Sequence, residues 1–174
     1  MIFEKELWLK INMKLRLIYA SLMVVFSIRL GSCQDQENNY EMITTKVLKS
    51  NEEWKQILTP DQYYITREKG TELAFSGKYN HFYENGVYLC VNCGNLLFIS
   101  ETKYDSKSGW PSYYKPAEES SVSVVVDNSL RMTSSEVVCA KCDAHLGHVF
   151  EDGPEPTGLR YCVNSGALSF KENK

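Results

Sequence analysis

The first hydrophobic stretch of the chain is a continuous run rather than a periodic pattern. Residues 17–28 (LIYASLMVVFSI) are apolar or small over 12 positions, and Lys14 and Arg16 come just before them. A helix needs about 20 apolar residues to cross a bilayer, so this run is too short for a membrane span. A basic start, a short apolar run and small residues after it are typical of a secretory signal. We therefore expect three parts: a targeting segment over 1–33, a polar tether over 34–45 and a folded domain over 46–172.

Two short helices are predicted at the start of this domain. Ser50 with Glu53, and Thr59 with Gln62, have the spacing of a capping box, in which the two side chains satisfy backbone N–H groups of the first turn. Pro60 stands at a first helical position, where proline is favoured. We expect helices at about 51–58 and 60–68.

After Gly70 the pattern changes to short runs rich in Val, Tyr, Leu and Phe, separated by Gly, Asn, Asp and Pro. Such runs indicate strands. Asp127 and Asn128 lie between two of them and predict a tight hairpin turn. The expected fold is therefore mainly β, with antiparallel strands and a short helical N-terminal part. The predicted strands are 86–91, 95–99, 121–126, 129–134, 136–140, 147–150, 160–164 and 167–170.

The charge of the chain is unevenly distributed. Its 174 residues include 19 basic and 22 acidic side chains, a net charge of -3. Residues 1–33 hold five basic and two acidic groups, so the rest of the chain has 14 basic against 20 acidic groups. An acidic domain argues against nucleic-acid binding, which usually needs a basic face. A hydrophobic content of 43% supports a packed core rather than a disordered chain.

The end of the predicted targeting segment has a further feature. Residues 30–33 (LGSC) resemble the bacterial lipobox, in which the cysteine, here Cys33, is lipidated and becomes the new N-terminus. Arg29 is unusual beside such a box, and an ordinary cleaved signal with an incidental cysteine is the alternative. Translation could start at Met1 or at Met13. The segment predicts an exported protein or lipoprotein of the cell envelope, with a cytoplasmic location as the alternative and the membrane face left open.

The chain has six cysteines, and four of them form two pairs with two-residue spacers. Zinc prefers four tetrahedral ligands, which two such turns can supply. Disulfides in an exported protein and a redox pair of the thioredoxin type are the alternatives. A redox pair needs a helix that starts at the pair after a strand, and neither pair has that setting. The spacing favours one structural zinc ion held by Cys90, Cys93, Cys139 and Cys142.

Cys162 lies outside these pairs, in a predicted strand. A single cysteine in an apolar strand is often a small buried hydrophobe. Arg160 and Asn164 are two residues away on either side, so in a strand they share the face of Cys162. A neighbouring arginine favours the reactive thiolate form. From the residues alone, a buried thiol and a reactive thiol both remain open.

Two other groups of residues are candidates for a site. His145 and His148 lie three residues apart just after the second cysteine pair, as metal ligands or as core histidines bonded to the backbone. Trp110 lies in an aromatic loop, residues 108–114, which could be a small packed lid or a binding cage. His81 has no partner nearby in the sequence, and we expect it to be structural or exposed.

Taken together, these motifs closely resemble the type B methionine sulfoxide reductases, which reduce the R epimer of methionine sulfoxide. The resemblance covers about residues 46–170. Besides the two cysteine pairs, the matching blocks are TREKGTE (66–72), FSG (75–77), GWPS (109–112), AHLGHVF (144–150), DGP (152–154), PTG (156–158) and RYCVNS (160–165).

The resemblance implies a fold and a set of site residues. The fold would be a β-tent (Mss4-like): two antiparallel sheets with a structural zinc ion on the four paired cysteines. Cys162 matches the nucleophile, and Trp110 matches the aromatic residue that holds the methyl group of the sulfoxide. Arg160 matches a position beside the nucleophile. The groups that position the sulfoxide oxygen and assist its protonation match His145, His148 and Asn164.

One departure from the family pattern affects the catalytic cycle. Many members have Ser-Gly-Cys before Gly-Trp-Pro-Ser, and that cysteine resolves the oxidised nucleophile, whereas this chain has serine at position 108. Lipidation would remove the thiol of Cys33, although an unmodified Cys33 on a flexible tether could reach Cys162. We predict that an external thiol such as thioredoxin regenerates Cys162. The protein is expected to be a monomer that acts on oxidised methionine in peptides and proteins.

Two other classes of function compete with this hypothesis. A non-catalytic zinc module of the same fold that binds a protein partner would explain the paired cysteines but not Cys162, Trp110 and the histidines together. A thiol–disulfide oxidoreductase would need one cysteine pair free of metal. The sequence leaves open the electron donor and the preference for free or protein-bound methionine sulfoxide.

Overall fold

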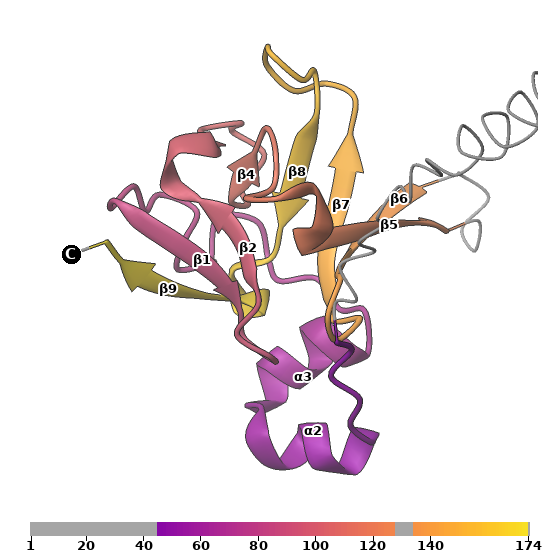
Figure 1. Ribbon diagram of the computed structural model, residues 1–174. Helices are drawn as coiled ribbons and strands as arrows, with labels where there is room; N and C mark the ends of the chain where they lie inside the picture. The colour runs from indigo at the N-terminus through magenta and orange to yellow at the C-terminus, as the bar shows by residue number, and fades with distance from the viewer. Residues whose placement is uncertain (1–44, 128–133, 174) are drawn as a thin grey trace, which may run out of the picture. The chain divides into compact units, whose positions relative to one another are not determined.

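Two short helices precede nine strands in the part of the chain that the computed structural model describes, residues 45–127 and 134–173 (Figure 1). The helices are α2 (Asn51–Ile57) and α3 (Pro60–Arg67). The strands are β1 (Gly86–Cys90), β2 (Leu96–Ile99), β3 (Lys103–Tyr104), β4 (Ser112–Tyr113), β5 (Val122–Asp127), β6 (Ser134–Cys139), β7 (His145–Phe150), β8 (Arg160–Val163) and β9 (Leu168–Glu172).

Both helices begin with the capping boxes that the sequence predicts. The Ser50 hydroxyl accepts the backbone N–H of Glu53, and the Glu53 carboxylate accepts the N–H of Ser50 at 2.7 Å. Thr59 and Gln62 make the same reciprocal pair at the start of α3. Each box satisfies two backbone N–H groups that the first turn leaves without helical partners. The predicted helices are confirmed, and each ends one residue earlier than expected.

The strands form two antiparallel sheets. A three-stranded sheet has the order β2-β1-β9, and a six-stranded sheet has the order β3-β4-β8-β7-β6-β5. Every strand pairing among the described residues is antiparallel. The predicted fold class, mainly β with two antiparallel sheets and short N-terminal helices, is therefore confirmed.

Aromatic side chains join the two sheets. Phe98 of β2 stacks on Tyr113 of β4 with ring centroids 4.3 Å apart, and Tyr88 of β1 meets the same ring edge-on at 5.3 Å. Tyr161 of β8 also lies against Phe98, at 6.0 Å. Tyr88, Phe98 and Tyr113 are fully buried. Such pairs contribute about 0.5–1.5 kcal/mol each beyond the burial of their area, so these contacts hold the sheets together.

The bounds of the described strands differ from the predicted ones by one or two residues, and there are two larger differences. The two-residue strands β3 and β4 were not predicted, because two residues show no alternation. The predicted turn at Asp127 is wrong in register, since Asp127 belongs to β5 and pairs with Ser134 of β6. The connection between them, residues 128–133, lies outside the described residues, as does nearly all of the predicted strand 129–134.

The predicted targeting segment and nearly all of the predicted tether, residues 1–44, also lie outside the described residues. Cys33 is among them. Within the described ranges, none of the helices has the length and apolar character needed to cross a membrane.

Candidate active site and metal centre

The register of four strands gathers polar side chains into one row. Cys162 of β8 pairs with Ser112 of β4 on one side and with His148 of β7 on the other. His148 in turn pairs with Glu136 of β6. Directly opposed residues of neighbouring strands project to the same face, about 5 Å apart. A hydroxyl, a thiol, an imidazole and a carboxylate therefore follow one another across the six-stranded sheet.

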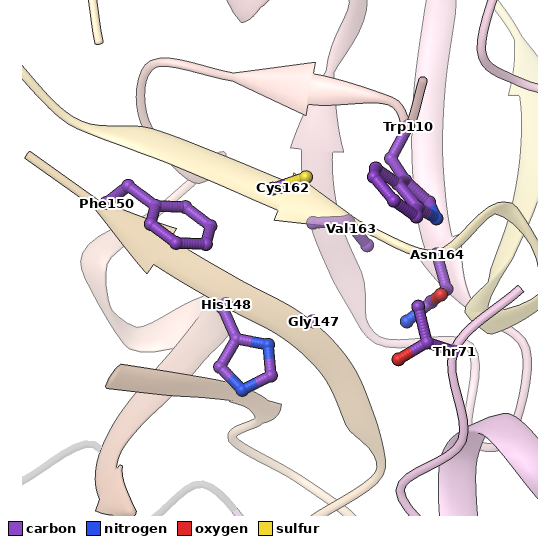
Figure 2. Close-up of a pocket in the computed structure, with 8 residues that line it drawn as sticks. All are labelled: Thr71, Trp110, Gly147, His148, Phe150, Cys162, Val163 and Asn164. Carbon is purple, nitrogen blue, oxygen red and sulfur yellow. The ribbon is translucent and has the colours of Figure 1, made fainter. Parts of the chain in front are cut away.

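A cavity of about 150 Å³ opens at the two middle residues of this row, Cys162 and His148 (Figure 2). Cys162 is partly exposed to it, and in this view its sulfur lies between the rings of Trp110 and Phe150. The cavity thus combines a thiol, an imidazole and two aromatic walls. Its lining residues are Thr71, Trp110, Gly147, His148, Phe150, Cys162, Val163 and Asn164.

Gly147 allows β7 to pass close to the backbone of Cys162. Its φ of 156° lies at the edge of a region that side chains disfavour, and a Cβ at this position would meet the carbonyl oxygen of Cys162 at 2.0 Å. Only glycine fits such a close approach of two backbones. The floor of the cavity beneath the thiol therefore requires a glycine here.

The indole of Trp110 is held by the loop that follows α3. Its Nε1–H donates to the carbonyl oxygen of Glu72 at 3.2 Å. One residue earlier, the carbonyl oxygen of Gly109 accepts the N–H of Phe75 at 2.7 Å. These two bonds attach the Trp110 loop to residues 72–75, so the ring has a fixed orientation at the cavity wall.

The same glutamate also orients Asn164, which is buried at the end of β8. The Asn164 Oδ1 accepts the Glu72 N–H at 3.1 Å, and its Nδ2 donates to the Leu146 carbonyl at 3.0 Å. The Glu72 carboxylate accepts the N–H groups of Ser165 and Gly166 at 2.7 and 3.0 Å. Asn164 therefore lines the cavity in an orientation that backbone groups set.

The two histidines occupy different environments. His148 lines the cavity, whereas His145 is buried, with its Nδ1 2.8 Å from Oε1 of Glu136. The two imidazole rings meet edge-on, 5.6 Å between centroids. Burial lowers the pKa of His145 below its usual value, although the bond to Glu136 opposes this. His145 is therefore neutral near pH 7, and it reaches the site only through its neighbours.

Glu136 is buried at 2% exposure and has a second partner, Lys69, whose Nζ donates to Oε2 at 2.7 Å. Burial alone would raise the pKa of Glu136, but the bonds from Lys69 and His145 bring it below its ordinary value. Glu136 is therefore a carboxylate that shares its two oxygens between an ammonium and an imidazole.

Arg160 shares the face of Cys162, as predicted, but its charge is already paired. Its Nε and Nη2 both donate to the Asp152 carboxylate at 2.8 Å, which lowers the pKa of Asp152. The guanidinium also lies 4.3 Å from the ring centroid of Phe150. Arg160 thus borders the cavity through Phe150, and its expected effect on the thiol stays a prediction.

A serine stands beside the thiol at the position discussed for a resolving cysteine. The Ser108 Oγ is 3.7 Å from the Cys162 Sγ and 2.8 Å from the Ser106 Oγ. Ser106 in turn contacts the Ser112 Oγ at 2.7 Å. A hydroxyl cannot form a disulfide, so the sulfur of Cys162 faces a chain of hydroxyl groups instead of a second thiol.

The four paired cysteines meet between the two sheets. Cys90 ends β1 of the smaller sheet and Cys139 ends β6 of the larger one, and each pair completes itself in the turn that follows. Neither turn opens a helix, which a thioredoxin-type redox pair would need. The four Sγ atoms all lie within 4.8 Å of one another, and those of Cys90 and Cys142 are 3.6 Å apart.

This sulfur cluster fits a tetrahedral metal ion. Sulfur atoms at about 2.3 Å from a zinc ion lie about 3.8 Å apart, close to the spacing here. The crowding also splits the thiol pKa values. Hydrogen bonding with Cys139 raises the pKa of Cys90, and hydrogen bonding from Cys142 and Cys90 lowers the pKa of Cys139. Four convergent thiols, two of which (Cys93 and Cys139) have a lowered pKa, are the donor set that zinc prefers.

Sequence reasoning missed several residues of the site. Thr71, Phe150 and Val163 line the cavity without a role having been expected for them. Glu136 could have been noticed, because it is a single acidic residue in the otherwise neutral strand SSEVVC. The role of Glu72 could not have been predicted, because two of its four hydrogen bonds involve its backbone N–H and carbonyl groups rather than its side chain. His81 was expected to be either structural or exposed, and it is exposed.

Comparison with known proteins places the chain in a family. The SelR domain matches residues 58–172. The relative from Hahella chejuensis, named peptide methionine sulfoxide reductase MsrB, is 56% identical over 125 residues, 72% of this chain and 90% of the relative. Relatives of the same name from Leptospira interrogans and Pseudomonas savastanoi are 52% and 60% identical, over 77% and 72% of this chain and 98% and 95% of their own lengths. The chain therefore belongs to the SelR-domain family, the type B methionine sulfoxide reductases.

Proposed function

We propose that this chain reduces the R epimer of methionine sulfoxide in peptides and proteins to methionine, with Cys162 as the nucleophile. The observation that carries this proposal is the position of Cys162 in a cavity between two aromatic walls, in register with His148. Family membership supports the reaction, and the cavity supports the roles of the residues.

The first half of the cycle transfers the sulfoxide oxygen to the enzyme. The Cys162 thiolate attacks the sulfoxide sulfur, the sulfur–oxygen bond of the substrate breaks, and the oxygen with one proton ends on the cysteine as a sulfenic acid. The cysteine sulfur is oxidised by two electrons and the methionine sulfur is reduced by two. His148 lines the cavity and is suited to supply the proton, because imidazole changes its charge near neutral pH.

The aromatic walls explain the choice of epimer. The Trp110 ring, fixed by its bond to the Glu72 carbonyl, offers an apolar surface to the methyl group of the sulfoxide. A methyl group held there leaves only one of the two epimers with its oxygen towards His148 and Asn164. The other epimer would direct its oxygen at an apolar wall, where it would lose its hydrogen bonds.

The second half of the cycle needs a thiol from outside the described part of the chain. Of the five cysteines there, four are in the sulfur cluster, and Ser108 faces Cys162 with a hydroxyl. We propose that an external dithiol of the thioredoxin type attacks the sulfenic acid and releases water. Its second thiol then displaces Cys162 and closes the donor's own disulfide, which restores the Cys162 thiol.

We further propose that the sulfur cluster holds one structural zinc ion. Four sulfur ligands close the coordination shell and leave no position for substrate, so the metal would not take part in the reaction. Because Cys90 and Cys139 end strands of different sheets, the ion would tie the sheets together. Metal analysis of the purified protein tests this proposal, with one zinc per chain expected and a metal-free, fully folded protein contradicting it.

For its location, we propose that the protein is exported and attached by a lipid on Cys33, where it would repair oxidised methionines of envelope proteins. The basic pair, the apolar run and the LGSC sequence of residues 14–33 support this. Labelling cells with a fatty-acid analogue and fractionating them gives the test. Unprocessed, unlabelled protein in the cytosol would contradict the proposal.

The reaction is tested with the full-length, metal-loaded chain, a small dithiol and separate R and S epimers of a methionine sulfoxide peptide. We expect turnover of the R epimer alone. Cys162→Ser should abolish it, whereas the matched variant Cys33→Ser should retain it with this reductant. Absence of turnover from a folded, zinc-loaded wild-type protein would contradict the proposal and favour the non-catalytic zinc module.

A further inference from the structure

A buried carboxylate lies next to both histidines of the site. Glu136 bonds His145 at 2.8 Å through one oxygen and Lys69 at 2.7 Å through the other, and it is the cross-strand partner of His148. Only 2% of its surface is exposed. Burial of a carboxylate is costly unless it is paired, and here both oxygens are paired while the registered His148 lines the cavity.

The bond to Glu136 determines where His145 carries its proton. A carboxylate only accepts hydrogen bonds, so the Nδ1 of His145 must be the donor. In the neutral ring the Nε2 then has a lone pair and no hydrogen. This Nε2 is buried and has no hydrogen-bond partner among the described residues. A buried acceptor without a partner costs free energy, so the arrangement does not serve stability alone.

We propose that Glu136 is a positioning residue for the reduction, which holds His145 in the Nδ1–H tautomer and places a fixed negative charge beside His148. The inference rests on the proposed function. The proton leaves the imidazolium of His148 for the oxygen that departs from the substrate, and Glu136 keeps its negative charge throughout. The fixed negative charge beside the pair attracts the positive charge of the imidazolium, which favours proton delivery from this side of the cavity.

Lys69 makes this proposal separable from a purely structural role. The charged and titratable groups that act on His145 are Glu136 from β6, Lys69 from the segment just after α3 and His148 from β7. The positive charge of Lys69 opposes the effect of Glu136. Removing the carboxylate and removing the ammonium should therefore move the pH dependence of the rate in opposite directions. If the ion pair were only structural, both variants would instead lose stability, and neither would shift the pH profile.

The first test uses nitrogen NMR of the histidine rings in the full-length, zinc-loaded wild-type protein. The chain has three histidines, and His81→Gln and His148→Gln identify their signals. We expect His145 as the Nδ1–H tautomer above neutral pH and this signature to change in Glu136→Gln. An Nε2–H tautomer in the wild-type protein would overturn the proposal without any variant having to fold.

The second test is the pH profile of kcat with the R epimer. Turnover needs a proton for the departing oxygen, so the rate falls on the alkaline limb of the profile as that proton is lost. We expect Glu136→Gln to move this limb to lower pH by about one to two units and Lys69→Met to move it to higher pH. Glu101→Gln, an exposed carboxylate elsewhere, is the matched control and should leave the limb unchanged.

Unshifted limbs, or shifts of Glu136→Gln and Lys69→Met in the same direction, would overturn the proposal. If Glu136→Gln fails to fold, the proposal is tested by the alkaline limb of the pH profile of Lys69→Met and by the tautomer of His145 in the wild-type protein. Failure of the proposed function is distinguishable, because the wild-type protein would then show no turnover at all, whatever tautomer His145 has.

Discussion

Replacing Ser108 by cysteine should give this enzyme an internal resolving thiol. The Ser108 Oγ already lies 3.7 Å from the Cys162 Sγ, and a disulfide requires sulfur atoms about 2.05 Å apart, so the two atoms must approach by about 1.6 Å. The loop that carries Ser108 has its two neighbours, Lys107 and Gly109, at positive φ, and Lys107 is exposed. The movement must come from the exposed turn at Lys107, because the Gly109 carbonyl stays bonded to the Phe75 N–H.

The size of the effect follows from effective concentration. A tethered thiol acts at an effective concentration on the order of millimolar, about 100-fold above a donor thiol supplied at about 10 μM. In Ser108→Cys the sulfenic acid should therefore be consumed internally before the external donor reacts. The assay is a single turnover with the R epimer and no external thiol, followed by alkylation and peptide mapping. We expect a disulfide between the new thiol and Cys162 in the variant.

The wild-type protein is the control and should give a sulfenic acid that reacts with an added trapping reagent. The matched variant is Ser106→Cys, two residues earlier in the same loop. Among the described residues Ser106 makes no hydrogen bond to Cys162, so this variant should form little disulfide. A Ser108→Cys protein that reduces the substrate but keeps the trappable sulfenic acid would refute the reasoning. So would a disulfide between Cys33 and Cys162 in the native protein.

Three further predictions concern the fold around the site. Gly147→Ala should destabilise the protein by about 1–3 kcal/mol in a denaturant titration, because its Cβ would meet the Cys162 carbonyl at 2.0 Å; an unchanged midpoint would show that the strands can separate. Removing metal with a chelator should lower the unfolding free energy by several kcal/mol, measured by thermal unfolding with and without added zinc, and an unaffected midpoint would contradict the structural role. The folded-state pKa of Glu136 is lowered from 4.5, so its stabilising contribution is present above that pH and is lost as the pH falls through the folded value. Acid titration of stability should therefore be less steep in Glu136→Gln than in the wild-type protein, and equal slopes would contradict the ion pairing.

Much of the fold could be predicted because its signals are local. The capping boxes at Ser50 and Thr59 fixed the starts of both helices, and turn residues delimited most of the strands. The two cysteine pairs predicted a cluster of four sulfur atoms, which the geometry bears out. By contrast, β4 has only two residues and exists because it pairs with β8, a contact between residues about 50 positions apart. The sequence around Ser112 contains no local signal that predicts this pairing.

The site was predicted by residue type more than by geometry. Sequence reasoning grouped His145 with His148, but a bulge between β6 and β7 gives the two rings different surroundings, one against Glu136 and the other in the cavity. It placed Arg160 beside Cys162 without a partner for its charge being foreseen, because the bidentate bond to Asp152 depends on how the loop between β7 and β8 folds back. The hydrogen-bond partners of His145 and Arg160 depend on tertiary contacts, which cannot be predicted from the local sequence.

The account depends most directly on Cys162 as the acceptor of the sulfoxide oxygen. The measurement is a stoichiometric reaction of the full-length protein with each epimer in the absence of any thiol, with methionine quantified and every cysteine mapped by mass spectrometry. The account predicts one methionine per chain from the R epimer, none from the S epimer, and oxidation confined to Cys162. Methionine formed with Cys162 still reduced, or oxidation found in the sulfur cluster instead, would contradict it.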